Sequence, residues 1–380
     1  MSQYTFRVPL SLPTFDGNEL TYLQECVAAR RVSSLGRFLD DFESLFESTV
    51  GTPHAIACQS GTAAIHLALI ALGVERGDEV WVSDLTFIAS ANPAAHLGAR
   101  IVLIDSEPVT GNLDVDVVID ELERRARSGS PLPKAIVPVH LVGHVAAVDR
   151  LIDVVRSHGV HVIEDSTESL GATWTAGWAA GRSVGTLGEV GCFSFNGNKL
   201  LSTGGGGMIV TSDAALAARM RHLSTQAKLP GLAYLHDEAG FNYRLTNVAA
   251  AIGLAQLERI DATCAAKRAI ARRYREGLAG SNVEGPIDPD GVAPVHWLST
   301  VRVATESVRD RALRALHEAG FEARALWPPL RHQTPYRESL VIGGDVAVDL
   351  SARSINLPSS VDLTLEDQAE IIAVLRDHAG

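Results

Sequence analysis

The chain has 380 residues, of which 46% are hydrophobic, and it carries a formal net charge of −12. A chain of this length can bury a large core, either in two domains or in one large domain with an appendage. The acidic balance argues against nucleic acid or an anionic membrane surface as a partner, because both attract a basic face.

The cysteines and the N-terminus indicate the class of protein. Four cysteines lie far apart and form no CxxC pair: Cys26, Cys58, Cys192 and Cys264. This spacing favours reduced, buried thiols over a zinc site or a disulfide framework. The N-terminus shows no basic segment followed by an apolar run, and no stretch reaches the roughly eighteen apolar residues of a membrane span. We therefore expect a cytoplasmic protein without a bound metal.

The first fifty residues predict an irregular arm and two helices. Pro9, Pro13 and Gly36 interrupt the pattern around a helix expected over Glu19–Arg31. Acidic and apolar residues then alternate at helical spacing over Phe38–Val50, which predicts a second helix.

A strand, a tight turn and a helix follow. His54–Cys58 is predicted as a buried strand, and an apolar helix follows the SGT turn and ends at Gly73. The free N–H groups at the start of such a helix, with the hydroxyls of Ser60 and Thr62, can hold a phosphate dianion without a basic side chain. An ordinary N-cap made by Ser60 explains the same residues. The segment alone leaves both interpretations open.

The next hundred residues alternate between strand and helix patterns. The predicted strands are 79–83, 99–105, 134–139 and 160–164, and the predicted helices are 89–97, 115–127 and 147–158. This alternation predicts βαβ units, and therefore a parallel sheet between helices with the ligand at the carboxyl ends of the strands.

Several chemically active side chains stand where these strands end. Phe87 and His140 each follow a strand, and Asp165 closes another, with Glu168 just beyond it. A carboxylate at the end of a buried strand needs a cation or a strong donor. The protonated ring nitrogen of a cofactor is such a partner, whereas a cap of the next turn is the ordinary alternative. We interpret His140 and His144 as loop residues and not as a metal pair.

Residues 191–211, GCFSFNGNKLLSTGGGGMIVT, predict two apolar strands around one lysine and four glycines. The amine of Lys199 can attack a carbonyl once it has lost its proton, which an apolar pocket or a neighbouring cation favours. Glycines 204–207 let the backbone approach a bound group closely. A surface lysine in a hairpin loop explains the pattern equally well.

The remainder predicts a smaller domain. A helix over 214–223 precedes a loop, 224–243, whose length indicates a function. Helices over 248–260 and 265–278 and a segment rich in proline and glycine, 280–294, follow. Strands over 298–303 and 322–325 and helices over 309–319 and 365–376 complete the chain. We divide it into residues 1–250, an arm and a large domain, and 251–380, linking helices and a small C-terminal α/β domain.

These parts occur together in a known family. The chain resembles the DegT/DnrJ/StrS aminotransferases over nearly its whole length, in ACQSGTAAIHLAL, GDEVWVSDLTFIASANPAAHLGARIVLID, VHLVGH, VIEDSTESLGA, GTLGEVGCFSFNGNKLLSTGGGGMIVT and FNYRLTN. The resemblance implies the α/β transferase fold of type I, with a mainly parallel sheet, and pyridoxal 5'-phosphate as the cofactor. FNGNK, TGGGG and IDSEP are most similar to members that aminate C4 of 4-keto-6-deoxyhexoses on a nucleoside diphosphate.

The resemblance also implies the roles of the cofactor-binding residues. Lys199 would form the internal aldimine with the cofactor and later move the proton. Asp165 would pair with the ring nitrogen, and Phe87 would stack on the ring. The residues that would hold the phosphate are Gly61, Thr62 and Ser194.

One further position implies an assembly, and two positions depart from the family pattern. Asn242 matches a residue that reaches the cofactor phosphate of a neighbouring subunit, which implies a homodimer with shared active sites. Glu168 stands where many members have a glutamine that contacts the ring oxygen. Arg331 stands where the family usually has a histidine, with His332 next to it, so no role is carried over to either.

The expected reaction is the transfer of an amino group from an amino acid, with L-glutamate the family's usual donor, to C4 of a dTDP- or UDP-linked sugar. The sequence leaves GDP open as the carrier nucleotide. Amination at C3 and a cofactor-bound regulatory protein are the alternatives. Family members that dehydrate the sugar carry histidine at the position of Lys199, so the lysine favours transamination. A nicotinamide dehydrogenase would need GxGxxG, and a P-loop NTPase would need GK before serine or threonine; neither motif is in place here.

Overall fold

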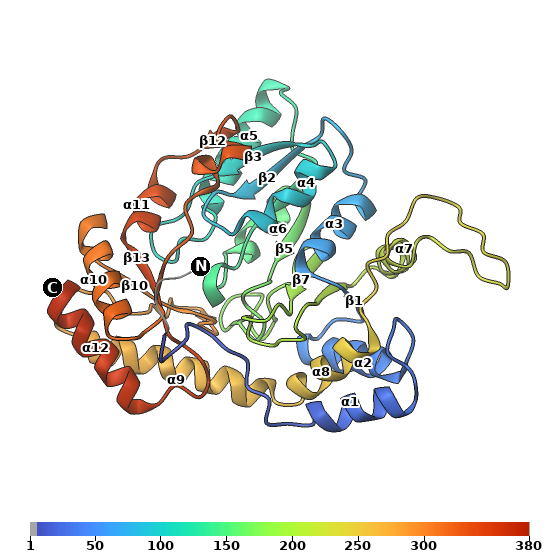
Figure 1. Ribbon diagram of the computed structural model, residues 1–380. Coiled ribbons are helices and arrows are strands. Elements are labelled where there is room, and N and C mark those ends of the chain that lie inside the picture. The colour runs from blue at the N-terminus through green and yellow to red at the C-terminus, as the bar shows by residue number, and fades with distance from the viewer. Residues whose placement is uncertain (1–5, 380) are drawn as a thin grey trace.

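The computed structural model of the chain describes residues 6–379. Its main body is an eight-stranded sheet with the order β1-β8-β7-β5-β4-β2-β3-β12 (Figure 1). β8 is antiparallel to both of its neighbours, and the other adjacent pairs are parallel. The predicted, mainly parallel sheet is confirmed. Its strands are β1 (His54–Cys58), β2 (Glu79–Ser83), β3 (Arg100–Ile104), β4 (Ala135–Val137), β5 (His161–Asp165), β7 (Val190–Ser194), β8 (Gly207–Thr211) and β12 (Leu340–Ile342).

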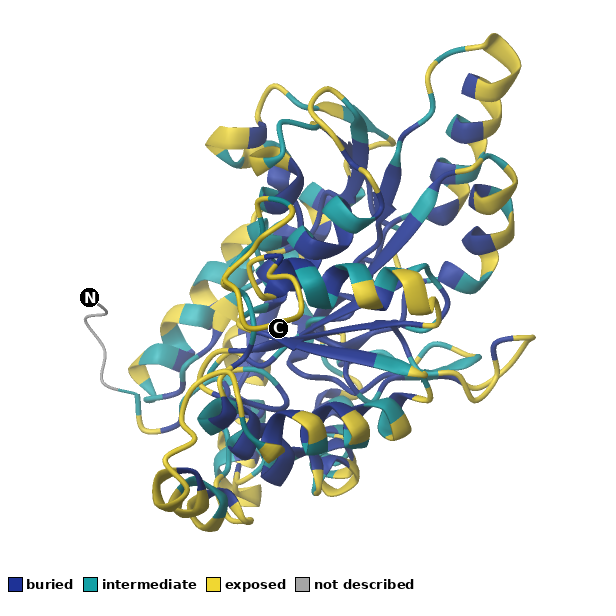
Figure 2. Cartoon of the chain, turned by 90° about the vertical axis from the view of Figure 1, so that its right-hand side faces the viewer, coloured by how far each residue is buried: buried dark blue, intermediate teal, exposed yellow. Residues whose placement is uncertain are grey.

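Helices cover both faces of this sheet (Figure 1). One face carries α3 (Gly61–Ala71), α4 (Asn92–His96) and α7 (Ala214–Ser224), and the other carries α2 (Arg37–Val50), α5 (Val115–Ser128), α6 (Val148–Ser157) and α8 (Asn247–Leu257). Alternate residues of one strand enter separate hydrophobic clusters. Val80 and Val82 pack on the first face, and Trp81 packs on the second. Burial of both faces explains why the strands are almost continuously apolar in sequence, and Figure 2 shows them as the buried centre of the molecule.

A smaller sheet lies beside this body. Its antiparallel strands are β10 (Ser299–Arg302), β13 (Ser354–Leu357) and β11 (Arg324–Ala325), and its helices are α10 (Glu306–Glu318) and α12 (Leu365–Ala379). The long helix α9 (Ile260–Leu278) runs from α8 to this smaller part (Figure 1). Its apolar residues share one hydrophobic cluster with the small sheet and with α10 and α12.

Two segments cross between the two parts of the chain. Val8 of the N-terminal arm forms a bridge with Phe321 in the smaller part. In the other direction, β12 joins the edge of the large sheet by pairing with β3, and α11 (Val346–Arg353) follows it. Each part of the chain therefore contributes a segment that pairs with the other part. The division into two domains after residue 250 remains a prediction.

The remaining short elements are α1 (Glu19–Ala28), the pair β6 (Thr173–Trp174) and β9 (Val292–Ala293), and four 3-10 turns (Ile88–Ser90, Leu141–Gly143, Leu330–His332 and Thr334–Tyr336). The helix predicted for 89–97 is wrong in detail, because it splits into the turn Ile88–Ser90 and α4. The ring of Pro93 would clash with the carbonyl of residue 89 in a continuous helix. No helix among residues 6–379 is both long and apolar enough to cross a membrane.

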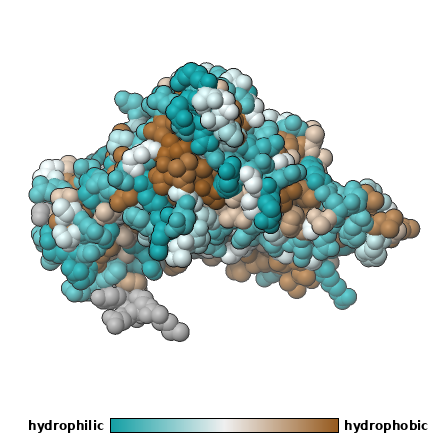
Figure 3. Space-filling view, turned by 90° about the horizontal axis from the view of Figure 1, so that it is seen from above, coloured by the Kyte–Doolittle hydropathy of each residue, from teal (hydrophilic) through white to brown (hydrophobic). Residues whose placement is uncertain are grey.

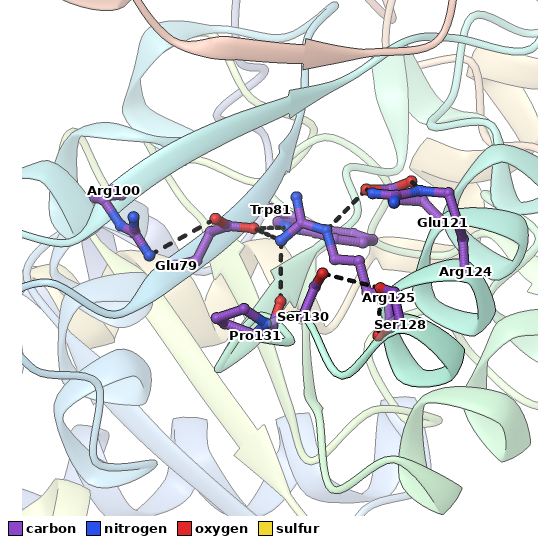
Figure 4. Close-up of polar contacts among 9 residues, drawn as sticks. All are labelled: Glu79, Trp81, Arg100, Glu121, Arg124, Arg125, Ser128, Ser130 and Pro131. Atoms are coloured by element: carbon purple, nitrogen blue, oxygen red, sulfur yellow. Dashed lines mark hydrogen bonds and ion pairs between the residues drawn. The ribbon is translucent and has the colours of Figure 1, made fainter.

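An ion network closes the amino-terminal edge of the large sheet (Figure 4). Arg125 of α5 stacks on Trp81, with its guanidinium carbon 5.1 Å from the ring centroid, and its Nη1 donates to Glu79 Oε1 at 2.5 Å. Its Nε donates to Glu121 Oε1 at 2.7 Å, and Arg124 donates to the same carboxylate from the solvent side. Hydrogen bonds from Arg124 and Arg125 lower the pKa of Glu121 to about 2.

We expect Arg125→Met to lower the free energy of unfolding by about 3–5 kcal/mol, because it leaves two carboxylates without their buried partner. Arg124→Ala removes only a solvent-exposed partner of Glu121 and should lower the free energy of unfolding much less, because water screens an exposed ion pair. Urea denaturation measures both. The contribution of Glu121 is present above its ordinary pKa of 4.5 and is lost as the pH falls toward 2. Equal losses in the two variants would contradict this account.

Candidate active site

A cavity of about 150 Å³ lies at the carboxyl ends of β2, β5 and β7. Its walls contain seven of the eight residues that the sequence analysis placed in the cofactor site: Gly61, Thr62, Phe87, Asp165, Glu168, Ser194 and Lys199. Asn242 does not line the cavity and is exposed. The chain therefore brings together residues from positions 61 to 199 at one edge of the sheet, where a parallel sheet binds its ligands.

The turn before α3 forms a cradle of backbone N–H groups. Ser60 caps the helix, with its Oγ accepting from Ala63 N at 3.1 Å. The N–H groups of Gly61 and Thr62 belong to the first turn of α3, where the helix itself supplies no hydrogen-bond acceptor. A Cβ on Gly61 would lie 2.9 Å from Ser194 Cβ and from Thr167 Cγ2, so only glycine fits. The cap and the phosphate interpretation are compatible, because the Ser60 side chain satisfies a different N–H.

The far side of the cavity is a buried carboxylate without a cation. Asp165 is 2% exposed, and its Oδ2 accepts from Ser90 Oγ at 2.7 Å while its Oδ1 accepts from Thr167 N at 3.1 Å. Both donors are neutral. A buried carboxylate is stabilised by a positive group, and among the described residues no cation forms an ion pair with Asp165. A protonated ring nitrogen in the cavity fits this unmatched charge.

Phe87 supplies an aromatic surface at the cavity mouth. The residue is 51% exposed, and its ring centroid lies 6.3 Å from that of Trp327. An aromatic face left uncovered beside a cavity can stack on a planar ring. The cavity thus offers three matched features, a phosphate cradle, a buried carboxylate and an aromatic wall, which together fit pyridoxal phosphate.

Lys199 has neighbours different from those expected. Its Nζ lies 3.4 Å from Glu168 Oε1 and 4.0 Å from the ring centroid of Trp297. A carboxylate and an aromatic face are both groups that attract a cationic side chain. The expectation of an apolar or cation-lined pocket is wrong, because Phe193 and Phe195 of the flanking segment point into the hydrophobic core instead.

Glu168 is placed to exchange a proton with this lysine. Burial raises the pKa of its carboxyl, against the opposing charge of Lys199. Its Oε2 accepts from Val142 N at 2.8 Å. Val142 has a φ of 47°, a left-handed conformation that is rare for a β-branched residue. The backbone is thus strained at the point where it donates to Glu168.

A larger cavity of about 780 Å³ adjoins the first. Its walls include Asn198, Trp297, Trp327 and His332. Trp297 also lies beneath Lys199, and Trp327 lies next to Phe87, so the walls of the two cavities are in contact at these residues. The two indoles are nearly parallel, at 15°, with centroids 6.3 Å apart.

Arg331 lines neither cavity but fixes the wall of the larger one. Its Nε donates to Asp84 Oδ2 at 2.5 Å, and its backbone N–H donates to Asp84 Oδ1 at 2.9 Å. Asp84 is fully buried at the end of β2. This pair ties the segment that carries Trp327 and His332 to the segment that carries Phe87.

The two histidines that the sequence analysis interpreted as loop residues, His140 and His144, are buried. His140 Nε2 lies 2.9 Å from Glu164 Oε2.

Sequence reasoning missed four residues of this region: Ser90, Thr167, Asn196 and Trp297. Thr167 lies between two predicted site residues, so its proximity offered a signal. Ser90 lies 75 residues from Asp165, and Trp297 comes from the second half of the chain, so only the tertiary fold brings them in.

Comparison with known proteins agrees with this geometry. Residues 13–376 match the DegT/DnrJ/EryC1/StrS aminotransferase family. The chain is 41% identical over 373 residues to a GDP-perosamine synthase from Caulobacter vibrioides, with 97% of each chain covered. It is 39% identical to the putative pyridoxal phosphate-dependent aminotransferase EpsN from Bacillus subtilis, with 97% of this chain and 95% of that protein covered.

Solved structures agree as well. The aminotransferase TlmJ from Streptoalloteichus hindustanus superposes with a TM-score of 0.89 at 29% identity and 98% coverage of both chains. A DegT DnrJ EryC1 StrS aminotransferase from Brucella abortus gives 0.88 at 30% identity, covering 96% of this chain and 95% of that one. The chain belongs to the DegT/DnrJ/EryC1/StrS family and is a sugar aminotransferase of fold type I that depends on pyridoxal phosphate.

We expect Gly61→Ala to weaken the binding of pyridoxal phosphate by at least about tenfold, because the added methyl group displaces Ser194 and Thr167 from the cradle. Gly197→Ala is the matched control, since its methyl group meets no atom within 4 Å. Titration of the apoprotein with the cofactor, followed by absorbance, compares the two. Normal affinity in the Gly61 variant would show that the phosphate binds elsewhere.

Proposed function

We propose that this member of the DegT/DnrJ/EryC1/StrS family transfers an amino group from an amino acid, with L-glutamate as the expected donor, to C4 of a nucleotide-linked 4-keto-6-deoxyhexose. The observation that carries the proposal is the position of Lys199. Its amine faces the cavity that contains the phosphate cradle and Asp165, and it lies on an indole that also lines the larger cavity.

Each residue has a distinct part in this proposal. Pyridoxal phosphate supplies an electron sink when it is bound. Lys199 holds the cofactor and, once free, carries a proton to and from the reacting carbon. Asp165 keeps the proton on the ring nitrogen, and Phe87 covers the ring. Glu168, with its raised pKa, takes up the proton that Lys199 must lose before it can react.

The larger cavity supports a nucleotide sugar as the acceptor. Its volume of about 780 Å³ lies within the range of small-molecule sites. The partly exposed indole of Trp327, supported by the buried indole of Trp297, offers a flat apolar face for a sugar ring or a base. Three relatives, from Caulobacter vibrioides, Escherichia coli and Vibrio cholerae, are GDP-perosamine synthases. We therefore propose GDP as the first candidate carrier, ahead of dTDP and UDP.

Amination at C3 is the second candidate. A relative from Acidithiobacillus ferrooxidans, 32% identical over 358 residues, is a UDP-N-acetyl-3-dehydro-alpha-D-glucosamine 3-aminotransferase. The regulatory alternative also has a counterpart, the pleiotropic regulatory protein of Geobacillus stearothermophilus, which is 31% identical. Lys199 in its cavity favours an enzyme over a regulator, because a bound sensor does not need a proton-transferring amine.

The test is turnover with a panel of acceptors. We expect L-glutamate to change the absorbance spectrum of the bound cofactor. A GDP-linked 4-keto-6-deoxy sugar should then restore the original spectrum and yield the C4 amine, which mass spectrometry and NMR identify. Lys199→Ala should abolish turnover, because no other cavity residue can replace its amine, and Lys199→Arg controls for charge. Near-normal turnover in Lys199→Ala, or restoration by a 3-keto sugar alone, would contradict the proposal.

We further propose a homodimer with shared active sites. The loop between α7 and α8 extends away from the body (Figure 1) and carries the exposed side chains of Leu232, Tyr234 and Leu235. The projecting tip is partly hydrophobic in Figure 3. Exposed apolar side chains gathered on such a loop mark an interface. Asn242 stands at the base of this loop and outside its own cavity, as a residue that serves a second copy would.

Leu232→Asp combined with Leu235→Asp is expected to shift the protein from dimer to monomer, because it buries two charges in the interface. The fold should survive, since both side chains are exposed in the single chain. Leu365→Asp, at an equally exposed leucine at the start of α12, is the control and should stay dimeric. Light scattering after gel filtration measures the mass. A double variant that remains dimeric would exclude this loop as the interface.

A further inference from the structure

Lys267 of α9 is a buried cation that the proposed reaction does not use. Its side chain belongs to a residue that is 2% exposed, and among residues 6–379 it forms no ion pair. Burial lowers its pKa to about 7, against the opposing charge of Asp362. A lysine in this position is costly. Its contacts show what it holds in place.

The amine of Lys267 donates to two groups. Its Nζ lies 3.0 Å from the carbonyl oxygen of Trp297 and 3.4 Å from Ser11 Oγ. Ser11 belongs to the N-terminal arm, so one amine joins three segments that are far apart in the sequence. A neutral amine still has two N–H donors, so both contacts persist on either side of the pKa.

Both of these contacts lead to Asn198, the residue before Lys199. Ser11 Oγ donates to the carbonyl oxygen of Asn198 at 3.2 Å. The indole Nε1 of Trp297 donates to the same oxygen at 2.7 Å. Two donors thus hold the peptide that leads into Lys199. Lys267 contacts both donor residues, Ser11 at its hydroxyl and Trp297 at its carbonyl oxygen, which also accepts from Ser359 Oγ at 3.1 Å.

The same indole also supports the lysine side chain. Lys199 Nζ lies 4.0 Å above the Trp297 ring. Lys199 and Lys267 line a common small cavity of about 60 Å³, so little protein separates them. We propose that Lys267 is a positioning residue that sets the direction from which Lys199 approaches the cofactor. This inference rests on the proposed role of Lys199.

A residue on the same helix provides the contrast. Tyr274 lies two turns further along α9, is fully buried, and donates its hydroxyl to the carbonyl oxygen of Pro358 at 2.8 Å. This hydrogen bond also joins α9 to a distant segment, and the next residue of that segment, Ser359, donates its Oγ to the carbonyl oxygen of Trp297 at 3.1 Å. Loss of the Tyr274 hydroxyl leaves the contacts of Lys267 and Ser11 in place, so we expect it to change stability more than the position of Lys199.

The experiment compares Lys267→Met with Tyr274→Phe. Apoprotein is mixed with pyridoxal phosphate, and the rate of covalent capture by Lys199 is followed by absorbance and by borohydride trapping. We expect Lys267→Met to slow capture and to lower kcat by roughly 10-fold to 100-fold with little change in KM, as a misplaced reacting group does. Tyr274→Phe should keep both rates within about twofold of wild type while lowering the melting temperature.

Ser11→Ala makes the test specific for the path of contacts. This variant removes one of the two donors to Asn198. It should slow capture about threefold, which corresponds to part of the net free energy of one hydrogen bond. If Ser11 acts through Lys267, the double variant is no slower than Lys267→Met alone, because effects within one network are not additive. Additive slowing, or unchanged capture in Lys267→Met, would overturn the proposal.

The remaining outcomes separate this proposal from the proposed function. If Lys267→Met does not fold, Ser11→Ala decides, and normal capture in that variant overturns the positioning role. A wild-type protein that captures the cofactor but aminates no sugar contradicts the proposed acceptor alone and leaves the capture rates valid. A wild-type protein that never captures the cofactor contradicts both.

Discussion

Burial of both faces of the large sheet is the constraint on which the rest of this structure depends. Helices on either side exclude water from the strands, so Val80, Trp81 and Val82 are all apolar. Polar and charged side chains can then reach an open space only where the strands end. The carboxylates of Asp84, Asp165 and Glu168 all stand at or just beyond such ends, and each is matched there by a donor.

The two ends of the sheet solve the problem of buried charge differently. At the amino-terminal edge, Arg125 pairs with both Glu79 and Glu121, and Arg100 and Arg124 give each carboxylate a second cation, so the network is closed. At the carboxyl edge, Asp165 has only neutral donors, and Lys199 faces Glu168 at 3.4 Å. A network in which every charge is paired contributes stability. A network with an unpaired charge is suited to binding a ligand of the opposite charge.

Local patterns were enough to predict most of the elements and most of the cavity. The SGT turn, the carboxylate at the end of β5 and the single lysine before four glycines are each contained within a few residues, so sequence spacing reveals them. The neighbours of Lys199 could not be found in this way. Trp297 contacts Lys199 and Ser11 contacts the preceding residue, Asn198, from segments far away in the sequence, and nothing in those segments distinguishes them from core or loop residues.

Errors in the local predictions have the same origin. The flanking phenylalanines suggested an apolar environment for Lys199, but strand alternation directs Phe193 to the core and leaves the lysine beside Glu168 and Trp297. Arg331 shows the converse. Its sequence position gave no role, and only the packing of its loop against β2 shows that it joins the walls of the two cavities.

The pairing of β12 with β3 has a consequence for biosynthesis. β3 leaves the ribosome early, but the strand that covers its outer edge lies some 240 positions later, at Leu340–Ile342. Until then the nascent large sheet has an open edge that other chains can pair with. Completion of the sheet therefore waits for translation of the last part of the chain, and β3 keeps an unpaired edge throughout that interval.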